Sequence, residues 1–270
     1  MQITQTEVCA TRSLLYTRAI VRPPVPNFAE GLTTVDLGVP DYHRALEQHS
    51  SYCAALERCG LTLITLEPDS RFPDSTFVED TAVLTKELAV LTRPGAPSRG
   101  GEVESIARSI RELFPVVETL SESATLDGGD ICEAGTHFFI GVSERTNEIG
   151  AHELASLLKR AGYTSTLVDI RNERDILHLK SGIAYLSGGR LAVTEPLSRR
   201  PEFRGFELLI VPIGEDYAAN CIEINDAVLI PAGFPKTEKA LGERGYQTLA
   251  LDMSEFQKMD GGLSCLSLRL

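Results

Sequence analysis

The segment DICEAGTHFFIGV, Asp130–Val142, contains the pattern that decides the fold of this chain. It consists of two short apolar runs on either side of a glycine, which is the pattern of a β-hairpin. Three further segments have the same form around a polar or glycine-containing break: Asp80–Arg93, Ser181–Glu195 and Asn220–Gly233. Their turns include Gly188-Gly189 and Asn225-Asp226, which favour tight reversals. Four similar hairpins indicate a repeat architecture.

Each hairpin is followed by a helix and one more strand. Apolar residues recur at helical spacing in Gly100–Phe114, Asn147–Gly162 and Pro235–Gly245, more weakly near Pro196–Arg200, and in a longer stretch before the first hairpin, Asp41–Gly60. A short apolar strand comes after each helix: Leu61–Leu66, Pro115–Leu120, Thr164–Ile170, Glu207–Pro212 and Tyr246–Leu251. The repeating unit is therefore strand–strand–helix–strand.

The two ends of the chain supply the missing hairpin. Ser13–Val21 and the terminal LSCLSLRL, Leu263–Leu270, are strand-like segments without a neighbour in sequence. Pairing them would give a fifth hairpin and remove an exposed sheet edge. We therefore predict one α/β domain over residues 1–270, a five-bladed pseudo-symmetric propeller of ββαβ units around a central pocket. An open α/β sandwich is the alternative.

Charge and composition restrict the classes of partner. The 270 residues contain 38 acidic and 26 basic side chains, for a net charge of −12, which argues against nucleic acid and anionic membrane surfaces as partners. No apolar run is long enough for a membrane helix, and the first residues do not resemble a signal peptide. The six cysteines form no CxxC pair. We expect a cytoplasmic protein with free thiols and no metal or cofactor.

Residues with catalytic chemistry gather just before the hairpins. The segments at these places are FPDSTFVED, TLDGGD, LHLKS, YAANC and KMDGGLSC. In a pseudo-symmetric ring, equivalent positions converge on the axis. We therefore expect a group of acidic, imidazole and thiol side chains to face one central pocket: Asp74, Glu79, Asp80, Asp127, Asp130, His178 and Cys265.

These residue types favour chemistry on a guanidinium. Cys265 can attack as a thiolate, His178 can act as general acid and base, and Asp127 can orient the imidazole. Several carboxylates in one pocket require a cation, and a guanidinium matches them with paired hydrogen bonds. Arg99 and Arg145 could hold a substrate carboxylate, so the substrate resembles arginine.

The other cysteines and histidines have simpler interpretations. We expect Cys9, Cys53, Cys59 and Cys132 to be core residues, whereas Cys221 could pack or line the pocket. His43, His49 and His152 fall on predicted helices and are expected at the surface. His137 falls in a hairpin and is expected to be structural.

The motifs closely resemble those of a known family. FPDSTFVEDTAVL, LTRPGAPSR, TLDGGD, FFIGVSERTN, LHLKS, ANCI and KMDGGLSC occur in the order found in the dimethylarginine dimethylaminohydrolases, which belong to the guanidine-modifying (pentein) superfamily. The matches run from about Phe72 to Leu268. The resemblance implies a five-bladed α/β propeller that hydrolyses Nω-methylated arginine to citrulline and dimethylamine or methylamine, through a covalent cysteine thiouronium and without metal or cofactor.

The resemblance also implies roles for individual residues. Cys265 would be the nucleophile, His178 the general acid and base, and Asp127 its acidic partner, where some relatives carry Glu. Substrate contacts would come from Asp74, Glu79, Asp80, Arg99, Arg145 and the backbone near Met259. Pro26–Thr34 resembles the family's lid loop, with Leu32 touching substrate.

Three other functions are alternatives to this one. An arginine deiminase would share the chemistry but release ammonia, and such enzymes carry an inserted helical domain for which 270 residues leave no room. An amidinotransferase would pass the amidino group to an amine. A non-catalytic ring-shaped translation factor would not need Cys265, His178 and Asp127 together. A homodimer through outer helices and the preference among methylated arginines stay open.

Overall fold

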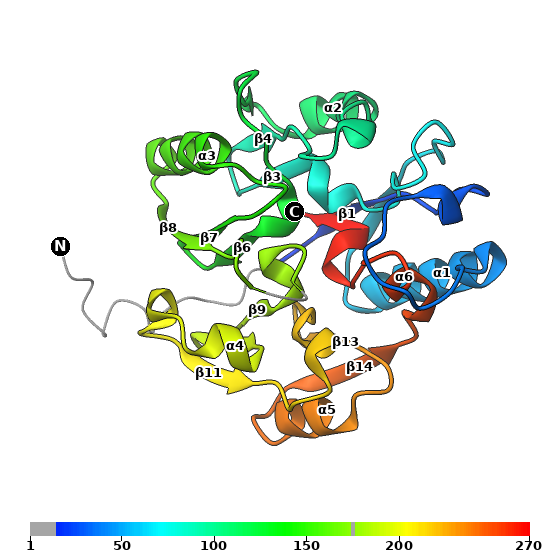
Figure 1. Cartoon of the computed structure of the whole chain (residues 1–270), viewed down its shortest axis with the longest axis vertical. Helices are drawn as coiled ribbons and strands as arrows, with labels where there is room; N and C mark the ends of the chain where they lie inside the picture. The colour runs from blue at the N-terminus through cyan, green and yellow to red at the C-terminus, as the bar shows by residue number, and fades with distance from the viewer. Residues whose placement is uncertain (1–14, 174–175) are drawn as a thin grey trace.

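The computed structural model describes residues 15–173 and 176–270. Five three-stranded sheets surround a central axis, and helices α1, α2, α3 and α5 lie at the outside (Figure 1). In every sheet the middle strand pairs antiparallel on one side and parallel on the other. The five-bladed α/β propeller predicted from the hairpin repeat is confirmed.

Four blades follow the ββαβ order along the chain. Their elements are β3 (Ala82–Leu84), β4 (Ala89–Leu91), α2 (Glu102–Leu113) and β5 (Val117–Thr119); β6 (Ile131–Ala134), β7 (His137–Val142), α3 (Glu148–Arg160) and β8 (Thr164–Asp169); β9 (Ile183–Leu186), β10 (Arg190–Val193), α4 (Glu195–Ser198) and β11 (Glu207–Ile210); and β12 (Ile222–Ile224), β13 (Ala227–Pro231), α5 (Pro235–Gly242) and β14 (Gln247–Leu251). Short helix α6 (Ser254–Gln257) follows the last of these.

The fifth blade joins the two ends of the described chain. Strand β1 (Arg18–Val21) pairs antiparallel with β15 (Ser267–Arg269), with Ile20 opposite Leu268, and parallel with β2 (Thr62–Thr65), which follows α1 (Tyr42–Arg58). Residues 13 and 14 of the expected first strand, and Cys9, lie outside the described residues. The sheet of this fifth blade therefore depends on the last strand of the chain.

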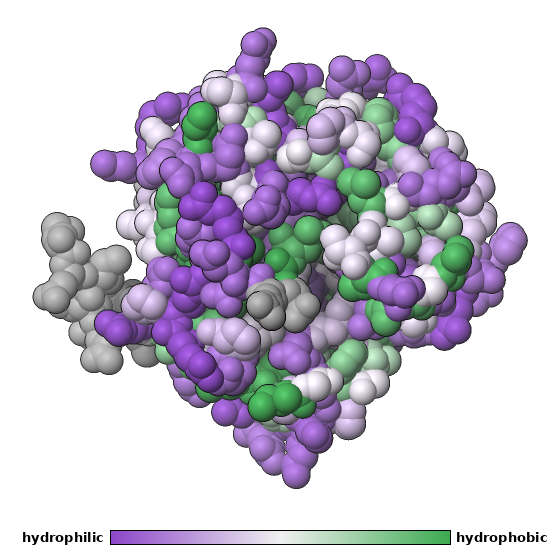
Figure 2. Space-filling model, viewed as in Figure 1, coloured by the Kyte–Doolittle hydropathy of each residue, from purple (hydrophilic) through white to green (hydrophobic). Residues whose placement is uncertain are grey.

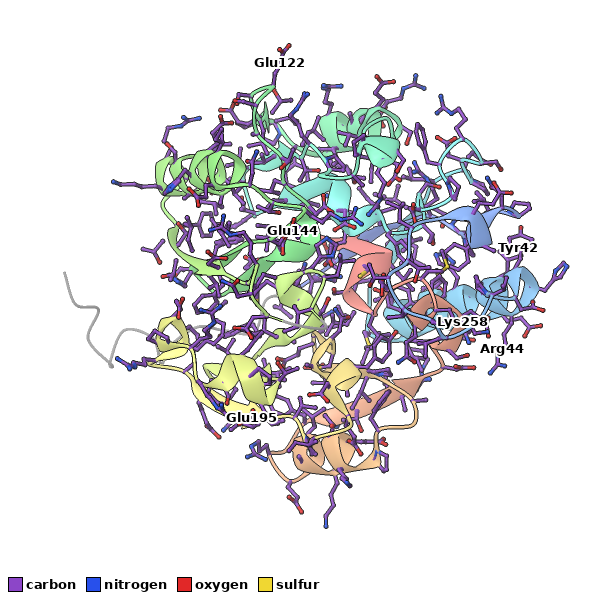
Figure 3. The ribbon with its side chains drawn as sticks, viewed as in Figure 1. Tyr42, Arg44, Glu122, Glu144, Glu195 and Lys258 are labelled. Atoms are coloured by element: carbon purple, nitrogen blue, oxygen red, sulfur yellow. The ribbon has the colours of Figure 1, made fainter. Side chains whose placement is uncertain are left out.

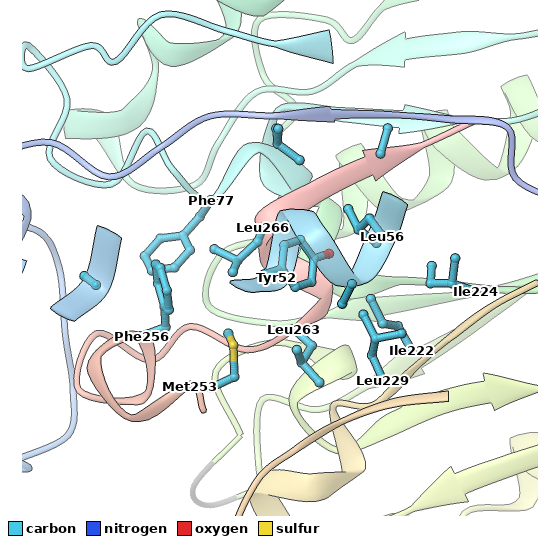
Figure 4. Packing of buried hydrophobic residues seen from close by; sticks show 14 of the residues in the cluster. Tyr52, Leu56, Phe77, Ile222, Ile224, Leu229, Met253, Phe256, Leu263 and Leu266 are labelled. Atoms are coloured by element: carbon cyan, nitrogen blue, oxygen red, sulfur yellow. The ribbon is translucent and has the colours of Figure 1, made fainter. Parts of the chain in front are cut away.

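Packing between blades explains why these segments form these elements. In β7 the residues Phe138, Phe139 and Ile140 are all buried, because one face packs toward α3 and the other toward the neighbouring blade. The core between the fifth blade and the blade of β12 to β14 includes Tyr52 of α1 and Leu266 (Figure 4). Figure 2 shows a largely hydrophilic rim on this face, with hydrophobic residues nearer its centre.

Five short 3₁₀ turns meet at the axis, each just before the first strand of a hairpin. They are η3 (Val78–Thr81), η5 (Gly128–Asp130), η6 (Leu179–Ser181), η8 (Asp216–Ala219) and η9 (Ser264–Leu266). Side chains of one turn hold the backbone of the next: Asp80 accepts from the Gly129 N–H, Asp130 from the Leu179 N–H, and Asn220 from the Ser264 N–H. Asn220, the residue after η8, also donates to the Lys180 carbonyl of η6, and Ser264 Oγ donates to Glu79, which closes the ring.

These turns correct one sequence prediction. Cys265 was expected within the closing strand, but it lies in η9, and β15 begins at Ser267. The Cys265 N–H donates to the Gly262 carbonyl, which curls the backbone into a turn before the strand. The segment before each of the other four hairpins curls in the same way. Within the described ranges, no helix combines the length and apolar character needed to cross a bilayer.

Candidate active site

A pocket with about 360 Å³ of space, part of it open to solvent, contains most of the predicted site. Its walls come from several blades and from the segment after β1. The lining residues are Leu32, Asp74, Phe77, Asp80, Arg99, Arg145, Leu177, His178, Met259, Asp260, Gly261 and Cys265. Figure 3 shows Glu144, from the same turn as Arg145, near the centre of the face in that view. Convergence of the pre-hairpin segments is what brings these residues together.

His178 and Asp127 form a buried pair at the base of this pocket. His178 Nε2 lies 2.9 Å from Asp127 Oδ2, and the Gly95 N–H donates to Asp127 Oδ1 at 2.8 Å. Asp127 is fully buried behind the imidazole. The aspartate side chain, where some relatives carry the longer Glu, therefore reaches His178 directly. The other ring nitrogen, Nδ1, faces the turn of Gly129, where a Cβ would lie 2.8 Å from it.

Electrostatics favour the charged form of this pair. Burial alone would lower the pKa of His178, but the charges of Asp80, Asp127 and Asp130 outweigh it and raise the pKa to about 9. Burial would raise the pKa of Asp127, but the hydrogen bond and charge of His178 outweigh this and lower it. At neutral pH the pair is an imidazolium beside a carboxylate, so His178 can donate a proton.

The Cys265 thiol is neutral in the free protein. Burial, followed by the charges of Glu79 and Asp80, raises its pKa to about 12. The Gly262 N–H, 3.3 Å from Sγ, opposes this only in part. A nearby cation would be required to make the thiolate accessible at neutral pH.

The Asp-Gly-Gly segment before Cys265 has steric reasons for its composition. A Cβ on Gly261 would lie 2.3 Å from the Phe77 ring, and one on Gly262 would lie 2.5 Å from the Asn220 amide oxygen. Neither position has room for a side chain. The segment thus packs tightly against η3 and η8 and delivers Cys265 to the pocket.

The two arginines of the pocket differ in their partners. Arg99 is buried; it donates to Asp80 at 2.6 Å, to Glu102 at 2.8–3.2 Å and to the Phe77 carbonyl at 3.1 Å. Its guanidinium therefore fixes Asp80 in place. The Arg145 side chain forms no hydrogen bond or ion pair with the described residues. Arg145 is the cation with donors available for a ligand.

The expected lid loop lies across the pocket. The Leu32 N–H donates to both oxygens of Asp74 at 3.1 and 3.2 Å, and Thr33 Oγ1 donates to the Lys258 carbonyl at 2.9 Å. The Thr34 N–H donates to Asp260. Phe28 of the same loop packs against the rings of Phe77 and Phe256. These contacts tie the loop to Asp74 and to the segment before Cys265.

Glu79, Asp130 and Asp127 do not line this pocket, although Asp127 contacts His178, which does. Glu79 is held by Lys180 at 2.5 Å, Arg269 at 2.9 Å and Ser264, and it lines a separate, larger pocket that is partly open to solvent. Asp130 is fully buried and accepts from Ser143 and Thr146. Neighbouring residues of a tight turn point in different directions, so Glu79 and Asp80 end on opposite sides.

The positions of His49 and Cys221 differ in how well they follow from the sequence. His49 was expected at the surface but is buried, and burial lowers its pKa to about 4. Cys221 is buried in the core and borders the larger pocket rather than the candidate site. Phe77, Leu177, Asp260 and Gly261 also line the pocket, although they were not among the predicted site residues. Each of these residues lies in one of the segments before the hairpins, and that position is the sequence feature that could have predicted them.

Asp80, Asp127 and His178 are also close enough to be considered as metal ligands. One ligand atom from each lies within 4.8 Å of the others. Asp80 already accepts from Gly129 and Arg99, and Asp127 from Gly95 and His178. A cation there would compete with the Arg99 guanidinium and the His178 proton, so the donor set does not fit a resident metal.

A five-bladed α/β propeller with a thiol, an imidazole and carboxylates at its axis defines a guanidine-modifying enzyme. The curated dimethylarginine dimethylaminohydrolase of Pseudomonas aeruginosa is 42% identical over 94% of this chain and 100% of its own length. That of Streptomyces coelicolor is 34% identical over 94% of this chain and 96% of its own. The chain belongs to the dimethylarginine dimethylaminohydrolase family. No family model matched the chain.

Solved structures agree with this assignment. A variant of the Pseudomonas aeruginosa enzyme in complex with citrulline superposes with a TM-score of 0.92 and 41% identity, covering 95% of this chain and all of that one. The N-terminal domain of ArgZ gives a TM-score of 0.80 at 21% identity, a likeness of fold alone.

Proposed function

We propose that this enzyme hydrolyses asymmetric dimethylarginine and monomethylarginine to citrulline and dimethylamine or methylamine. The observation that carries the proposal is one pocket lined by Cys265, His178 and the carboxylates of Asp74 and Asp80, with Asp127 buried behind His178. The names of the two bacterial relatives, and the citrulline bound to one of them, support the same reaction.

Substrate binding follows from the charges of the pocket. Asp74 and Asp80 would accept hydrogen bonds from the guanidinium nitrogens, with Asp80 held in place by Arg99. Arg145 would bind the α-carboxylate, and the backbone near Met259 would bind the α-amino group. Leu32 would cover the alkyl chain. Glu79 would act through its charge, because it lies across the turn ring from the pocket.

The first chemical step would form a covalent adduct. A bound guanidinium offsets the negative field of Asp80 and Glu79, so the Cys265 proton is released to water and the thiolate forms. The sulfur attacks the guanidinium carbon. As the C–N bond to the methylated nitrogen breaks, the His178 imidazolium donates a proton to that nitrogen. Dimethylamine leaves, and a thiouronium remains on Cys265.

The second step would regenerate the enzyme. His178, now neutral, removes a proton from a water molecule, and the resulting hydroxide attacks the thiouronium carbon. The C–S bond breaks, citrulline leaves and the thiolate recovers a proton. Asp127 keeps the imidazole oriented in both steps. The reaction transfers no electrons between redox groups, so the chain's own residues are sufficient for it.

Comparison of substrates tests the proposal. The purified enzyme is incubated separately with asymmetric dimethylarginine, monomethylarginine and arginine, and citrulline and the released amine are measured. We expect citrulline and dimethylamine in equal amounts from the dimethylated substrate. Faster turnover of arginine with ammonia release would favour the arginine deiminase alternative instead.

We also propose a cytoplasmic location. Five cysteines of the described chain are free thiols, which agrees with a reducing compartment. Assembly into a homodimer through outer helices is a further proposal, which sedimentation of the purified protein would test.

A further inference from the structure

Gly95 lies between two parts of the site that have separate chemical tasks. Its N–H donates to Asp127 Oδ1 at 2.8 Å, on the side of the His178 pair. Its other side faces the turn that carries Arg145: a Cβ on Gly95 would lie 2.2 Å from the Arg145 carbonyl oxygen and 2.6 Å from its Cα. The φ of Gly95 is not positive, so space rather than backbone conformation requires glycine here.

The contact with Gly95 fixes the rotation of the Asp127 carboxylate. Asp127 is fully buried, so water does not supply its hydrogen bonds. One oxygen meets His178 and the other meets the Gly95 N–H. A carboxylate held at both oxygens presents a single orientation to the imidazole. Without the Gly95 donor, only the His178 contact would orient it.

The Arg145 turn is tied to the same aspartate. Ser143 Oγ accepts from the N–H of Arg145 and of Thr146, both at 3.0 Å. Thr146 Oγ1 in turn accepts from the Asp127 N–H at 3.1 Å. Gly95 packs against this turn from the other side. The place of the Arg145 guanidinium, which has no partner among the described residues, therefore depends on Gly95 and Asp127 together.

We propose that Gly95 is a positioning residue that sets the Asp127–His178 pair and the carboxylate-binding Arg145 at a fixed distance from one another. It links substrate anchoring to proton transfer without touching the substrate. The role of Arg145 toward a carboxylate rests on the proposed function. The role of Gly95 toward His178 can be measured without turnover.

The kinetic test uses Gly95→Ala with Gly100→Ala as the matched control. Gly100 lies in the same loop, and a Cβ there meets only the Pro97 carbonyl at an ordinary 3.5 Å. For Gly95→Ala we expect kcat to fall roughly 10-fold with both dimethylarginine and dimethylagmatine, which lacks the carboxylate. The KM should rise roughly 10-fold for dimethylarginine only. Gly100→Ala should behave as the wild type.

The second test follows the His178 imidazole by NMR at increasing pH. The groups that face the pair are Asp80 from η3, Asp130 from η5 and the buried Arg99 from η4 (Pro97–Arg99), and Gly95→Ala changes none of them. An Asp127 carboxylate without its Gly95 hydrogen bond pairs less well with His178. The midpoint of the His178 pH titration should therefore fall by about one pH unit. An unchanged midpoint in Gly95→Ala, equal to that of Gly100→Ala, would overturn the proposal even if turnover is never observed.

A measurement on the wild type covers the case in which Gly95→Ala does not fold. The Gly95 amide proton points at Asp127, so its chemical shift should follow the titration of the Asp127–His178 pair. We expect a single transition at the same midpoint as His178. A Gly95 amide resonance that does not move through that transition would contradict the proposed contact.

Discussion

His178 and Asp127 lie 51 positions apart in the chain and meet through a 2.9 Å contact between Nε2 and Oδ2. Each stands at the start of a 3₁₀ turn, η6 and η5, and the two turns are joined by the hydrogen bond from the Leu179 N–H to Asp130. The turn ring, rather than any local motif, therefore holds the acid–base pair. The same ring of turns carries Cys265, in η9, to the pocket that His178 also lines.

The charged pair predicts a pH dependence of stability. The pKa of His178 is raised to about 9, above its ordinary value of 6.5. Its contribution to stability is therefore fully present below pH 6.5 and is lost as the pH rises through 9. Urea unfolding of the wild type and of His178→Gln between pH 6 and 10 should show a stability difference that shrinks over this window. A difference that stays constant across the window would contradict the assigned charge state.

The thiol of Cys265 is predicted to react slowly in the free enzyme. Its pKa is raised to about 12 by burial and the charges of Glu79 and Asp80. The rate of alkylation by iodoacetamide, followed by mass spectrometry of the Cys265 peptide, should therefore still increase at pH 11. Glutathione in the same solution, an ordinary thiol, should level off near pH 9–10. A plateau for Cys265 by pH 8 would show a thiolate in the resting enzyme.

The different partners of Arg145 and Arg99 predict different kinetic defects. Arg145→Ala should raise the KM for dimethylarginine about 10- to 100-fold with little change in stability, because it removes a charge-assisted contact of about 1.5–3 kcal/mol. Arg99→Ala should lower kcat and the melting temperature together, since it leaves buried Asp80 and Glu102 without their cation. Arg145→Lys serves as the control that keeps the charge. The same defect in both alanine variants would show that the assigned roles are wrong.

Removal of the last strand should abolish both fold and activity. Residues 267–270 include all of β15, and Tyr52 of the core is hydrogen-bonded to Ser267 at 2.7 Å. A chain ending at Leu266 would expose an edge of β1 and loosen the core beside Cys265. Circular dichroism and citrulline formation report the two losses. A chain extended after Leu270 by a short Gly-Ser tail is the control, and a truncated chain that stays folded and active would contradict ring closure.

The fold could be predicted because its signal is repeated. Hairpins such as Asp130–Val142 and Asp80–Arg93 recur with the same apolar pattern, and pseudo-symmetry then places equivalent segments at one axis. The two strand-like ends of the chain, Ser13–Val21 and Leu263–Leu270, then predicted the fifth blade. His49 was harder to place, because its helix has an apolar face whose extent depends on what packs against it. Its burial follows from tertiary packing around α1.

Directions of side chains at the axis could not be predicted. Glu79 and Asp80 are adjacent and both carry a carboxyl group, yet only Asp80 lines the candidate site. Arg99 was expected to bind substrate, and its contact with substrate stays a prediction; its guanidinium donates to Glu102, Asp80 and the Phe77 carbonyl. Gly95 has no chemical group that a sequence pattern would select. These relations depend on the rotation of each turn and on buried contacts between distant segments.

The most direct test of the account is the site of covalent attachment during turnover. The wild type and Cys265→Ser are mixed with asymmetric dimethylarginine, quenched in acid within the first turnover and digested for mass spectrometry. The account predicts an amidino adduct on the Cys265 peptide of the wild type, and at least about 10³-fold slower citrulline formation in Cys265→Ser with the fold intact. Citrulline produced at the wild-type rate by Cys265→Ser would contradict it.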